Sequence, residues 1–116
     1  MAVTIDDIRA AADRLERKVV RTPTLRSDAL SALCGANIVL KLENLQLTGS
    51  FKPRGVFIKL SGLSEEEVKA GVVAASAGKH AEGVAYHARN LGLPATIYMP
   101  EGTPFSKVGR TEALGA

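Results

Sequence analysis

Apolar residues recur at three- and four-residue intervals near the start of the chain, the spacing of one face of an α-helix. Thr4 precedes this stripe and Asp7 follows three residues later, a pairing that predicts a capped helix start. The helix is expected to end at residues 21–24, because a residue that precedes proline avoids the helical region. The stripe consists of Ile5, Ile8, Ala12, Leu15 and Val19.

Two short elements are expected next. Residues 27–33 predict a second helix, closed by the Cys-Gly-Ala-Asn sequence at 34–37. Residues 38–43 show partial alternation of apolar and polar side chains, which predicts a strand.

The middle of the chain predicts two helices. One should begin near Lys52, because the proline at position 53 costs no hydrogen bond in a first helical turn, and it should run to about Leu60. Ser64 and Glu67 have the spacing of a capping box and predict a short helix after it.

The clearest unit is a strand, a helix and a strand. Residues 71–76 and 95–99 are short apolar runs, and residues 80–91 place alanine, valine and leucine on one helical face before Gly92. Strands joined through such a helix are expected to be parallel, with a right-handed crossover.

A last helix is expected to start at Pro104, capped by Thr103, and to run towards Gly115. The order of elements predicts an α/β protein. Only two or three strands can be recognised, whereas parallel sheets are usually covered on both faces. We therefore expect a fragment, or a chain that depends on a partner.

Composition limits the partners. Apolar residues make up 46% and aromatic residues 4%, so aliphatic and alanine packing should dominate the core. The net charge is +3, but basic and acidic residues alternate along the chain, so no nucleic-acid partner is expected. No stretch reaches the length of a membrane span, and a mildly basic chain is compatible with a small anionic ligand.

The single cysteine, Cys34, excludes an internal disulfide, and no Cys/His spacing predicts a metal site. His80 and His87 are seven residues apart in the expected helix, but a partly exposed or core-lining position for His87 is a better interpretation than a metal ligand. The N-terminal segment carries acids where a secretory signal needs an apolar run, so the cytoplasm is the expected location.

Two loops could carry chemistry. In the first, residues 48–55, Lys52 stands at a helix start, where the helix dipole disfavours an ammonium by about 0.3–1 kcal/mol. A neutral amine is the form that reacts with an aldehyde, and Phe51 offers a flat apolar face beside it. The alternative is a surface lysine beside an ordinary loop–helix junction.

The second loop, residues 76–80, joins the carboxyl end of a strand to a helix start. Ligands of open α/β sheets bind at such positions, where free backbone N–H groups can hold a carboxylate or phosphate. Ser76 and His80 would add side-chain hydrogen bonds. The alternative is a capped helix start with Gly78 present for close packing.

Together the two loops resemble those of the fold-type-II pyridoxal-phosphate enzymes, whose architecture is like that of the tryptophan synthase β subunit. LTGSFKPRG at 47–55 is similar to the Ser-Phe-Lys-x-Arg-Gly pattern of the threonine/serine dehydratase (threonine ammonia-lyase) family, and residues 76–80 to its Ser-x-Gly-Asn-His loop. The resemblance extends to Arg-Thr-Pro at 21–23, Lys-Leu-Glu at 41–43 and the stretch 107–115. It therefore covers nearly the whole chain.

The resemblance implies a site and a reaction. Lys52 would form a Schiff base with pyridoxal 5'-phosphate and then move protons at the substrate α-carbon. Phe51 would lie near the pyridine ring. The loop containing Ser76, Gly78 and His80 would receive the carboxylate of the amino acid. L-threonine or L-serine would lose water to give a 2-oxo acid and ammonia, with the cofactor as electron sink.

It also implies a domain division. Residues 1–55 would be the N-terminal helix, strand and lysine loop of a large domain, and residues 56–116 the start of a small α/β domain. The family's glycine-rich phosphate cup and the residue that faces the pyridine nitrogen lie further along the chain and have no counterpart here.

One residue departs from the family pattern. Lys79 occupies the place of an asparagine that hydrogen-bonds the cofactor ring oxygen. A lysine there can still donate to a phenolate, but near a protonated imine it would lower the pKa of the imine by like-charge repulsion. A Lys79 side chain turned towards solvent is equally compatible with the sequence.

Several alternatives stay open. The chain could be a truncated, non-catalytic pseudoenzyme or a partner-binding fragment, and within the same fold it is also similar to serine racemase. A homo-oligomer is an expectation from the family alone.

Overall fold

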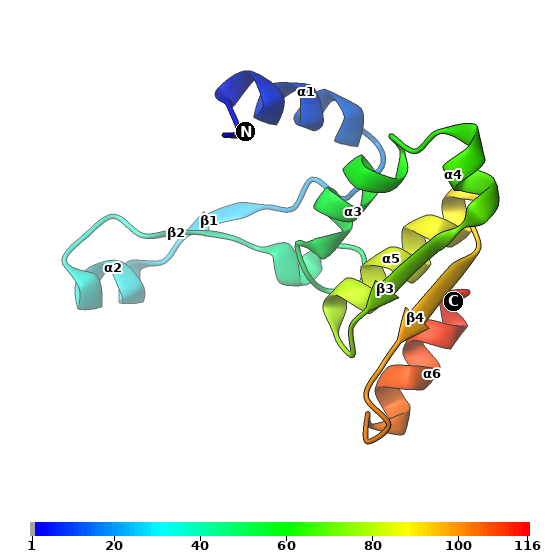
Figure 1. Ribbon diagram of the computed structural model, residues 1–116. Helices are drawn as coiled ribbons and strands as arrows, with labels where there is room; N and C mark the ends of the chain where they lie inside the picture. Colours follow the sequence, from blue (N-terminus) through cyan, green and yellow to red (C-terminus); the bar gives the residue numbers. More distant parts are fainter. Residues whose placement is uncertain (1) are drawn as a thin grey trace.

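The computed structural model describes residues 2–116 as an α/β body from which a slender arm projects (Figure 1). The predicted α/β class is confirmed. Within these residues no helix is long and apolar enough to cross a membrane. The helices are α1 (Ile5–Leu15), α2 (Asp28–Cys34), α3 (Lys52–Leu60), α4 (Glu65–Ala70), α5 (Lys79–Leu91) and α6 (Phe105–Ala113). The strands are β1 (Thr24–Arg26), β2 (Val39–Lys41), β3 (Val72–Ala75) and β4 (Ala95–Tyr98), and a 3₁₀ turn, η1, spans Glu43–Leu45.

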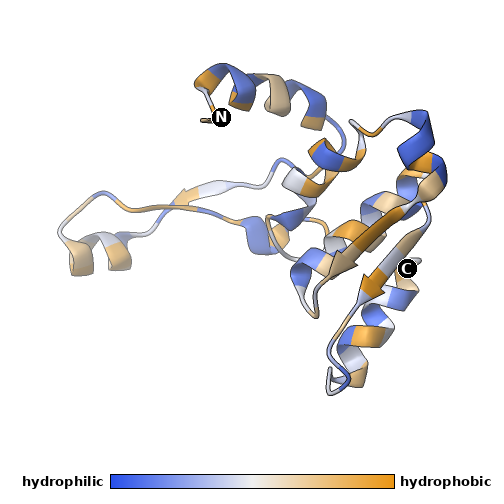
Figure 2. Ribbon diagram, viewed as in Figure 1, coloured by the Kyte–Doolittle hydropathy of each residue, from blue (hydrophilic) through white to orange (hydrophobic). Residues whose placement is uncertain are grey.

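The strand–helix–strand unit forms as predicted. β3 and β4 are parallel, with Val72 opposite Ala95 and Ala75 opposite Tyr98, and α5 packs against both strands. α5 ends at Gly92, whose left-handed backbone (φ 70°) closes the helix. Figure 2 shows hydrophobic colouring along β3 and on part of β4.

The core lies where α5 meets α3 and the β3–β4 sheet. Its buried members are aliphatic or alanine, in agreement with the low aromatic content: Val56, Leu60, Val84, Ala88 and Leu93. Alternate residues of β3 and β4 point into this core, and the others point outward, where Val73 is 71% and Tyr98 64% exposed. The sheet is therefore covered on one face and open on the other.

The arm consists of β1, α2 and β2. The two strands are antiparallel, with Leu25 opposite Leu40, and every residue of both strands is exposed. The sequence predicted the second strand somewhat too long, at 38–43, and missed β1, because three residues are too few to show alternation.

The structure corrects two predicted helix boundaries, the end of α1 and the start of α6. α1 ends at Leu15 rather than at residues 21–24, and Arg17 then adopts a left-handed backbone (φ 60°) that helices do not tolerate. The C-terminal helix begins at Phe105 and has Pro104 as its N-cap residue, so Thr103 is not the cap. The capping pairs Thr4–Asp7 and Ser64–Glu67 form as predicted.

Candidate active site

Lys52 is the first residue of α3, as predicted, and follows a tightly curved loop. Thr48 and Gly49 both have left-handed backbones (φ 61° and 68°), which reverse the chain direction before the helix. The Ser50 hydroxyl accepts a hydrogen bond from the Lys52 backbone N–H at 3.4 Å. This loop, residues 44–51, is called the lysine loop below, and it fixes where the lysine side chain leaves the backbone.

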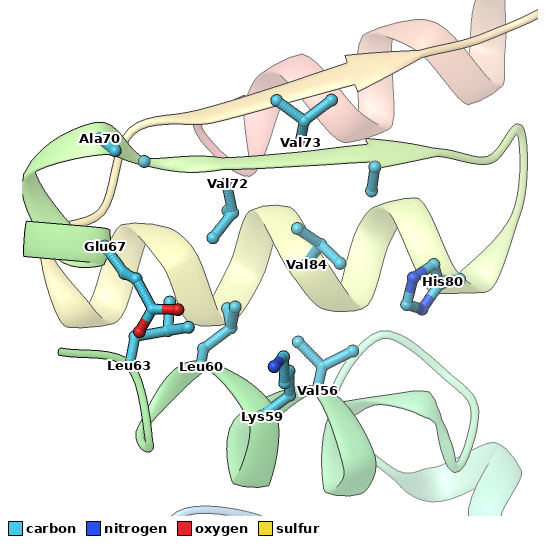
Figure 3. Close-up of a pocket in the computed structure, with 12 residues that line it drawn as sticks. Val56, Lys59, Leu60, Leu63, Glu67, Ala70, Val72, Val73, His80 and Val84 are labelled. Atoms are coloured by element: carbon cyan, nitrogen blue, oxygen red, sulfur yellow. The ribbon is translucent and has the colours of Figure 1, made fainter.

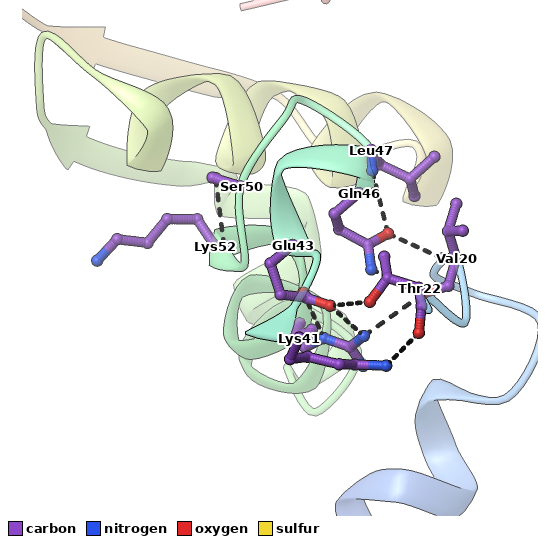
Figure 4. A network of polar contacts seen from close by, with 9 residues as sticks. Val20, Thr22, Lys41, Glu43, Gln46, Leu47, Ser50 and Lys52 are labelled. Atoms are coloured by element: carbon purple, nitrogen blue, oxygen red, sulfur yellow. Dashed lines mark hydrogen bonds and ion pairs between the residues drawn. The ribbon is translucent and has the colours of Figure 1, made fainter. Parts of the chain in front are cut away.

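The Lys52 side chain is exposed, and its Nζ lies 5.3 Å from the centre of the Phe51 ring. Figure 4 shows the Lys52 side chain pointing away from the polar network that contains Glu43. Its Nζ takes part in none of the ion pairs between the described residues. An amine in this setting is accessible to an incoming aldehyde.

A partly buried polar network supports the start of α3 (Figure 4). The Glu43 carboxylate accepts two hydrogen bonds from the Arg54 guanidinium, at 2.7 and 2.8 Å, and one from the Thr22 hydroxyl. The Arg54 guanidinium holds the pKa of Glu43 at about 2, against partial burial, which raises this pKa. Because Arg54 lies two residues after Lys52, the bidentate pair ties the first turn of α3 to the 3₁₀ turn η1.

The same network reaches the segment after α1. The side-chain amide of the buried Gln46 donates to the Val20 carbonyl and accepts from the Val20 N–H, both at 2.8 Å. Lys41 Nζ donates to the backbone carbonyl of Thr22. These hydrogen bonds join the segment after α1 to β2 and to the start of the lysine loop.

The second loop follows β3. Ser76 continues the sheet pairing through its N–H, which donates to the Tyr98 carbonyl at 3.0 Å, and its hydroxyl accepts from the Gly78 N–H at 3.2 Å. Gly78 is the N-cap residue of α5, and no side chain caps this helix. A Cβ at Gly78 would meet no atom within 4 Å. The space at the start of α5 is therefore open, which argues against the alternative in which Gly78 is present for close packing.

Lys79 brings the two loops together. Its Nζ lies 2.8 Å from Glu82 Oε2 and 3.8 Å from the point where a Cβ on Gly49 would stand. One turn later, a Cβ on Gly83 would lie 3.6 Å from the Cβ of Lys52. One face of α5 thus lies against both the lysine loop and Lys52. The Lys79 side chain is therefore not turned wholly towards solvent.

His80 lies elsewhere. Its side chain lines a cleft of about 390 Å³ between α3, α4, β3 and α5, together with Val56, Leu60, Val72 and Val84 (Figure 3). Successive side chains of a helix diverge by about 100°, so His80 and Lys79 cannot both face the lysine loop. The cleft is mostly apolar, and His80 stands at one end of it.

His87 lines the core, in agreement with the prediction. It is 2% exposed, its ring lies 5.3 Å from that of Phe57 and 5.0 Å from that of Tyr86, and burial lowers its pKa. Among the described residues no group of His, Cys, Asp and Glu side chains could hold a metal ion.

Sequence reasoning missed three contributors to this site. Glu43 and Arg54 belong to sequence motifs that do not indicate their pairing, and Glu82 belongs to none of the motifs. The spacing of Lys79 and Glu82, three residues apart at the start of an expected helix, was the one signal available for their ion pair.

The pyridoxal-phosphate dependent enzyme family model matches residues 15–116, so the chain belongs to this family. It is 54% identical over 114 residues to L-threonine ammonia-lyase of Thermotoga maritima, covering 98% of this chain and 28% of that protein. It is 52% identical over 110 residues to L-threo-3-hydroxyaspartate ammonia-lyase of a Pseudomonas species, covering 95% of this chain and 34% of that protein. The chain therefore spans about a third of the length of these relatives.

The structure superposes on maize serine racemase with a TM-score of 0.90 and 39% identity, covering 100% of this chain and 35% of that one. The architecture is thus that of the fold-type-II pyridoxal-phosphate enzymes, as the sequence predicted. Because the chain belongs to the pyridoxal-phosphate dependent enzymes, the predicted cofactor, pyridoxal phosphate, is confirmed.

The residues present fit one side of this cofactor. Its aldehyde needs an accessible amine, and Lys52 offers one beside the Phe51 ring. Its ring oxygen needs a hydrogen-bond donor, and the Lys79 ammonium stands against the lysine loop. The uncapped start of α5 adds backbone N–H groups that suit an anion.

Proposed function

We propose that this chain is the N-terminal part of an enzyme that converts L-threonine or L-serine into a 2-oxo acid and ammonia with pyridoxal 5'-phosphate. The observation that carries the proposal is the exposed side chain of Lys52 on the first residue of α3, the helix that packs against α5. The two ammonia-lyases named above support it, since both names describe removal of ammonia from amino acids with a β-hydroxyl.

The roles proposed for the residues follow from their positions. Bound pyridoxal phosphate supplies the electron sink for a carbanion at the substrate α-carbon. Lys52 holds the cofactor, and its freed amine takes the α-proton. The β-hydroxyl would leave as water with the proton that the Lys52 amine took from the α-carbon, and addition of one water to the released product would give the 2-oxo acid and ammonia.

The second loop is proposed to hold the substrate. The backbone N–H groups after Gly78 and the Ser76 hydroxyl suit a carboxylate. Phe51 is proposed to lie against the pyridine ring and Lys79 to meet the ring oxygen. His80 is proposed to take part in substrate binding through its backbone. Its side chain lines the apolar cleft instead.

A labelling experiment tests the proposal. The protein expressed from the natural reading frame that carries this sequence is mixed with pyridoxal phosphate and reduced with borohydride, and labelled peptides are located by mass spectrometry. We expect the label on Lys52, formation of 2-oxo acid from L-threonine or L-serine, and loss of both in Lys52→Ala. Lys59→Ala, a change at an exposed lysine of the same helix, is the matched control and should keep the label. A protein without label on Lys52 is not this enzyme.

Two other readings are outcomes of the same experiment. The TM-score of 0.90 to maize serine racemase favours racemisation as the second candidate function. Label on Lys52 with D-serine formed from L-serine, and no 2-oxo acid, would establish it. No label and no product would favour a non-catalytic, partner-binding chain.

The remaining expectations are part of the proposal. We propose a cytoplasmic location. The single cysteine, Cys34, is a free and exposed thiol, and such thiols are typical of proteins in a reducing compartment. The amino-acid substrate is the partner expected first, and sedimentation would show whether the protein is a homo-oligomer.

A further inference from the structure

The ion pair between Lys79 and Glu82 lies where α5 meets the lysine loop. Lys79 Nζ and Glu82 Oε2 are 2.8 Å apart, and the Glu82 side chain is only 10% exposed, against 44% for Lys79. Burying a carboxylate to this extent costs hydration free energy, which a partner of opposite charge offsets. Among the described residues, Lys79 is the partner that Glu82 has.

The ammonium of Lys79 has donors to spare. It carries three N–H bonds, and one of them points to Glu82. The Nζ is also 3.8 Å from the position of a Cβ on Gly49, so it stands directly against the lysine loop. The remaining donors can therefore serve a ligand oxygen held between the two loops.

The same helical face leads to Lys52. Gly83 follows Lys79 by four residues, which places both on one side of α5, and a Cβ on Gly83 would lie 3.6 Å from Lys52 Cβ. Besides Lys79, the charged or titratable groups near this junction are Glu82 and His80 on α5 and Lys52 on α3, and the His80 side chain lines the apolar cleft instead of the lysine loop. The lysine loop, residues 44–51, contains no ionisable side chain.

We infer that Glu82 is a positioning residue for Lys79, an inference that rests on the proposed function. It turns the ammonium towards the lysine loop and offsets its positive charge, so that Lys79 donates a hydrogen bond to an anionic ring oxygen without repelling a protonated imine at Lys52. Where the family pattern has a neutral asparagine, this chain has Lys79, and the opposite charge of Glu82 balances it.

Neutralising the two charges one at a time tests this inference. The readout is the pH midpoint of the long-wavelength absorbance of the Schiff base at Lys52, measured on the natural protein without substrate. Glu82→Gln leaves the Lys79 charge unbalanced and should lower the midpoint by on the order of one pH unit. Lys79→Asn leaves the carboxylate unbalanced and should raise it. The double variant, with two neutral amides, should return close to the parent value.

A purely structural pair would not move this midpoint. Equal midpoints in the parent and Glu82→Gln would overturn the inference. If Glu82→Gln does not fold, as judged by circular dichroism, the comparison of Lys79→Asn with the double variant replaces it, and equal midpoints there overturn the inference as well. Absence of any Schiff base at Lys52 in the parent contradicts the proposed function instead.

Discussion

Gly71 joins α4 to β3 with a backbone that other residues avoid. Its φ is 79°, and a Cβ there would stand 2.7 Å from the carbonyl oxygen of Pro94, which is closer than real contacts allow. The Gly71 N–H also closes α4 through the Glu67 carbonyl at 3.0 Å. The glycine is thus needed both for its conformation and for space.

Gly71→Ala is therefore expected to destabilise the protein by about 2 kcal/mol or more, from the left-handed backbone and the clash together. Urea unfolding would measure the loss. Gly109→Ala is the matched control, because Gly109 lies within α6 and a Cβ there meets nothing within 4 Å. Equal unfolding midpoints for the two variants would show that the strand start adapts without strain.

At the level of elements, the Glu43–Arg54 pair determines how α3 sits on the rest of the chain. Arg54 binds Glu43 at 2.7 and 2.8 Å and also donates to the Val20 carbonyl at 3.4 Å. The pair joins η1, the segment after α1 and the turn of α3 that begins at Lys52. Its loss would loosen the support of the lysine.

This pair predicts an acid-sensitive stability. The folded pKa of Glu43 is about 2, below the 4.5 of an unperturbed glutamate. A carboxyl pKa that is lower in the folded than in the unfolded protein stabilises the fold at pH values above the unfolded pKa. This contribution, on the order of 3 kcal/mol, is lost as the pH falls from about 4.5 to 2.

Glu43→Gln should therefore lower stability at neutral pH and flatten the dependence of the unfolding midpoint on pH in that window. Denaturant melts of the variant and the parent at a series of pH values would show it. Asp6→Asn, a change in the exposed pair with Arg9, is the control. Curves for Glu43→Gln and the parent that stay parallel from pH 4.5 to 2 would contradict the assignment.

The sequence predicted those elements whose information is local. β3, α5 and β4 carry a periodic apolar pattern, and the capping pairs are spaced by three residues, so they were found almost residue by residue. β1 has only Thr24, Leu25 and Arg26, and it forms because β2 pairs with it. Such a strand depends on tertiary context and leaves no periodic signal.

The candidate site likewise has one part that local sequence predicts and another part that depends on tertiary packing. Lys52 could be placed at its helix start from the adjacent proline, which is local information. The approach of Lys79 to Gly49, and of Gly83 to Lys52, arises from packing of α5 against α3 and could not be read from spacing. The predicted domain division at residues 55 and 56 falls within α3 and stays a prediction.

The whole molecule is more extended than a compact domain of its length. Its radius of gyration is 16.7 Å, against about 13 Å expected for a compact chain of this size. The projecting arm accounts for much of the difference (Figure 1). Large apolar side chains stand exposed along it: Leu25, Leu30, Leu33, Val39 and Leu40.

Local stability should therefore differ between the arm and the body. The two arm strands are exposed on every residue and bury no apolar side chain, whereas α5 contributes Ala81, Val84, Ala85 and Ala88 to the buried core. Amides whose hydrogen bonds are backed by few buried contacts open at low free-energy cost. For the 116-residue chain, hydrogen–deuterium exchange with peptide-level mass spectrometry should show rapid exchange across residues 24–41 and slow exchange in α5. Protection of the arm equal to that of α5 would mean that its apolar side chains are covered in solution, for instance by a second copy of the chain.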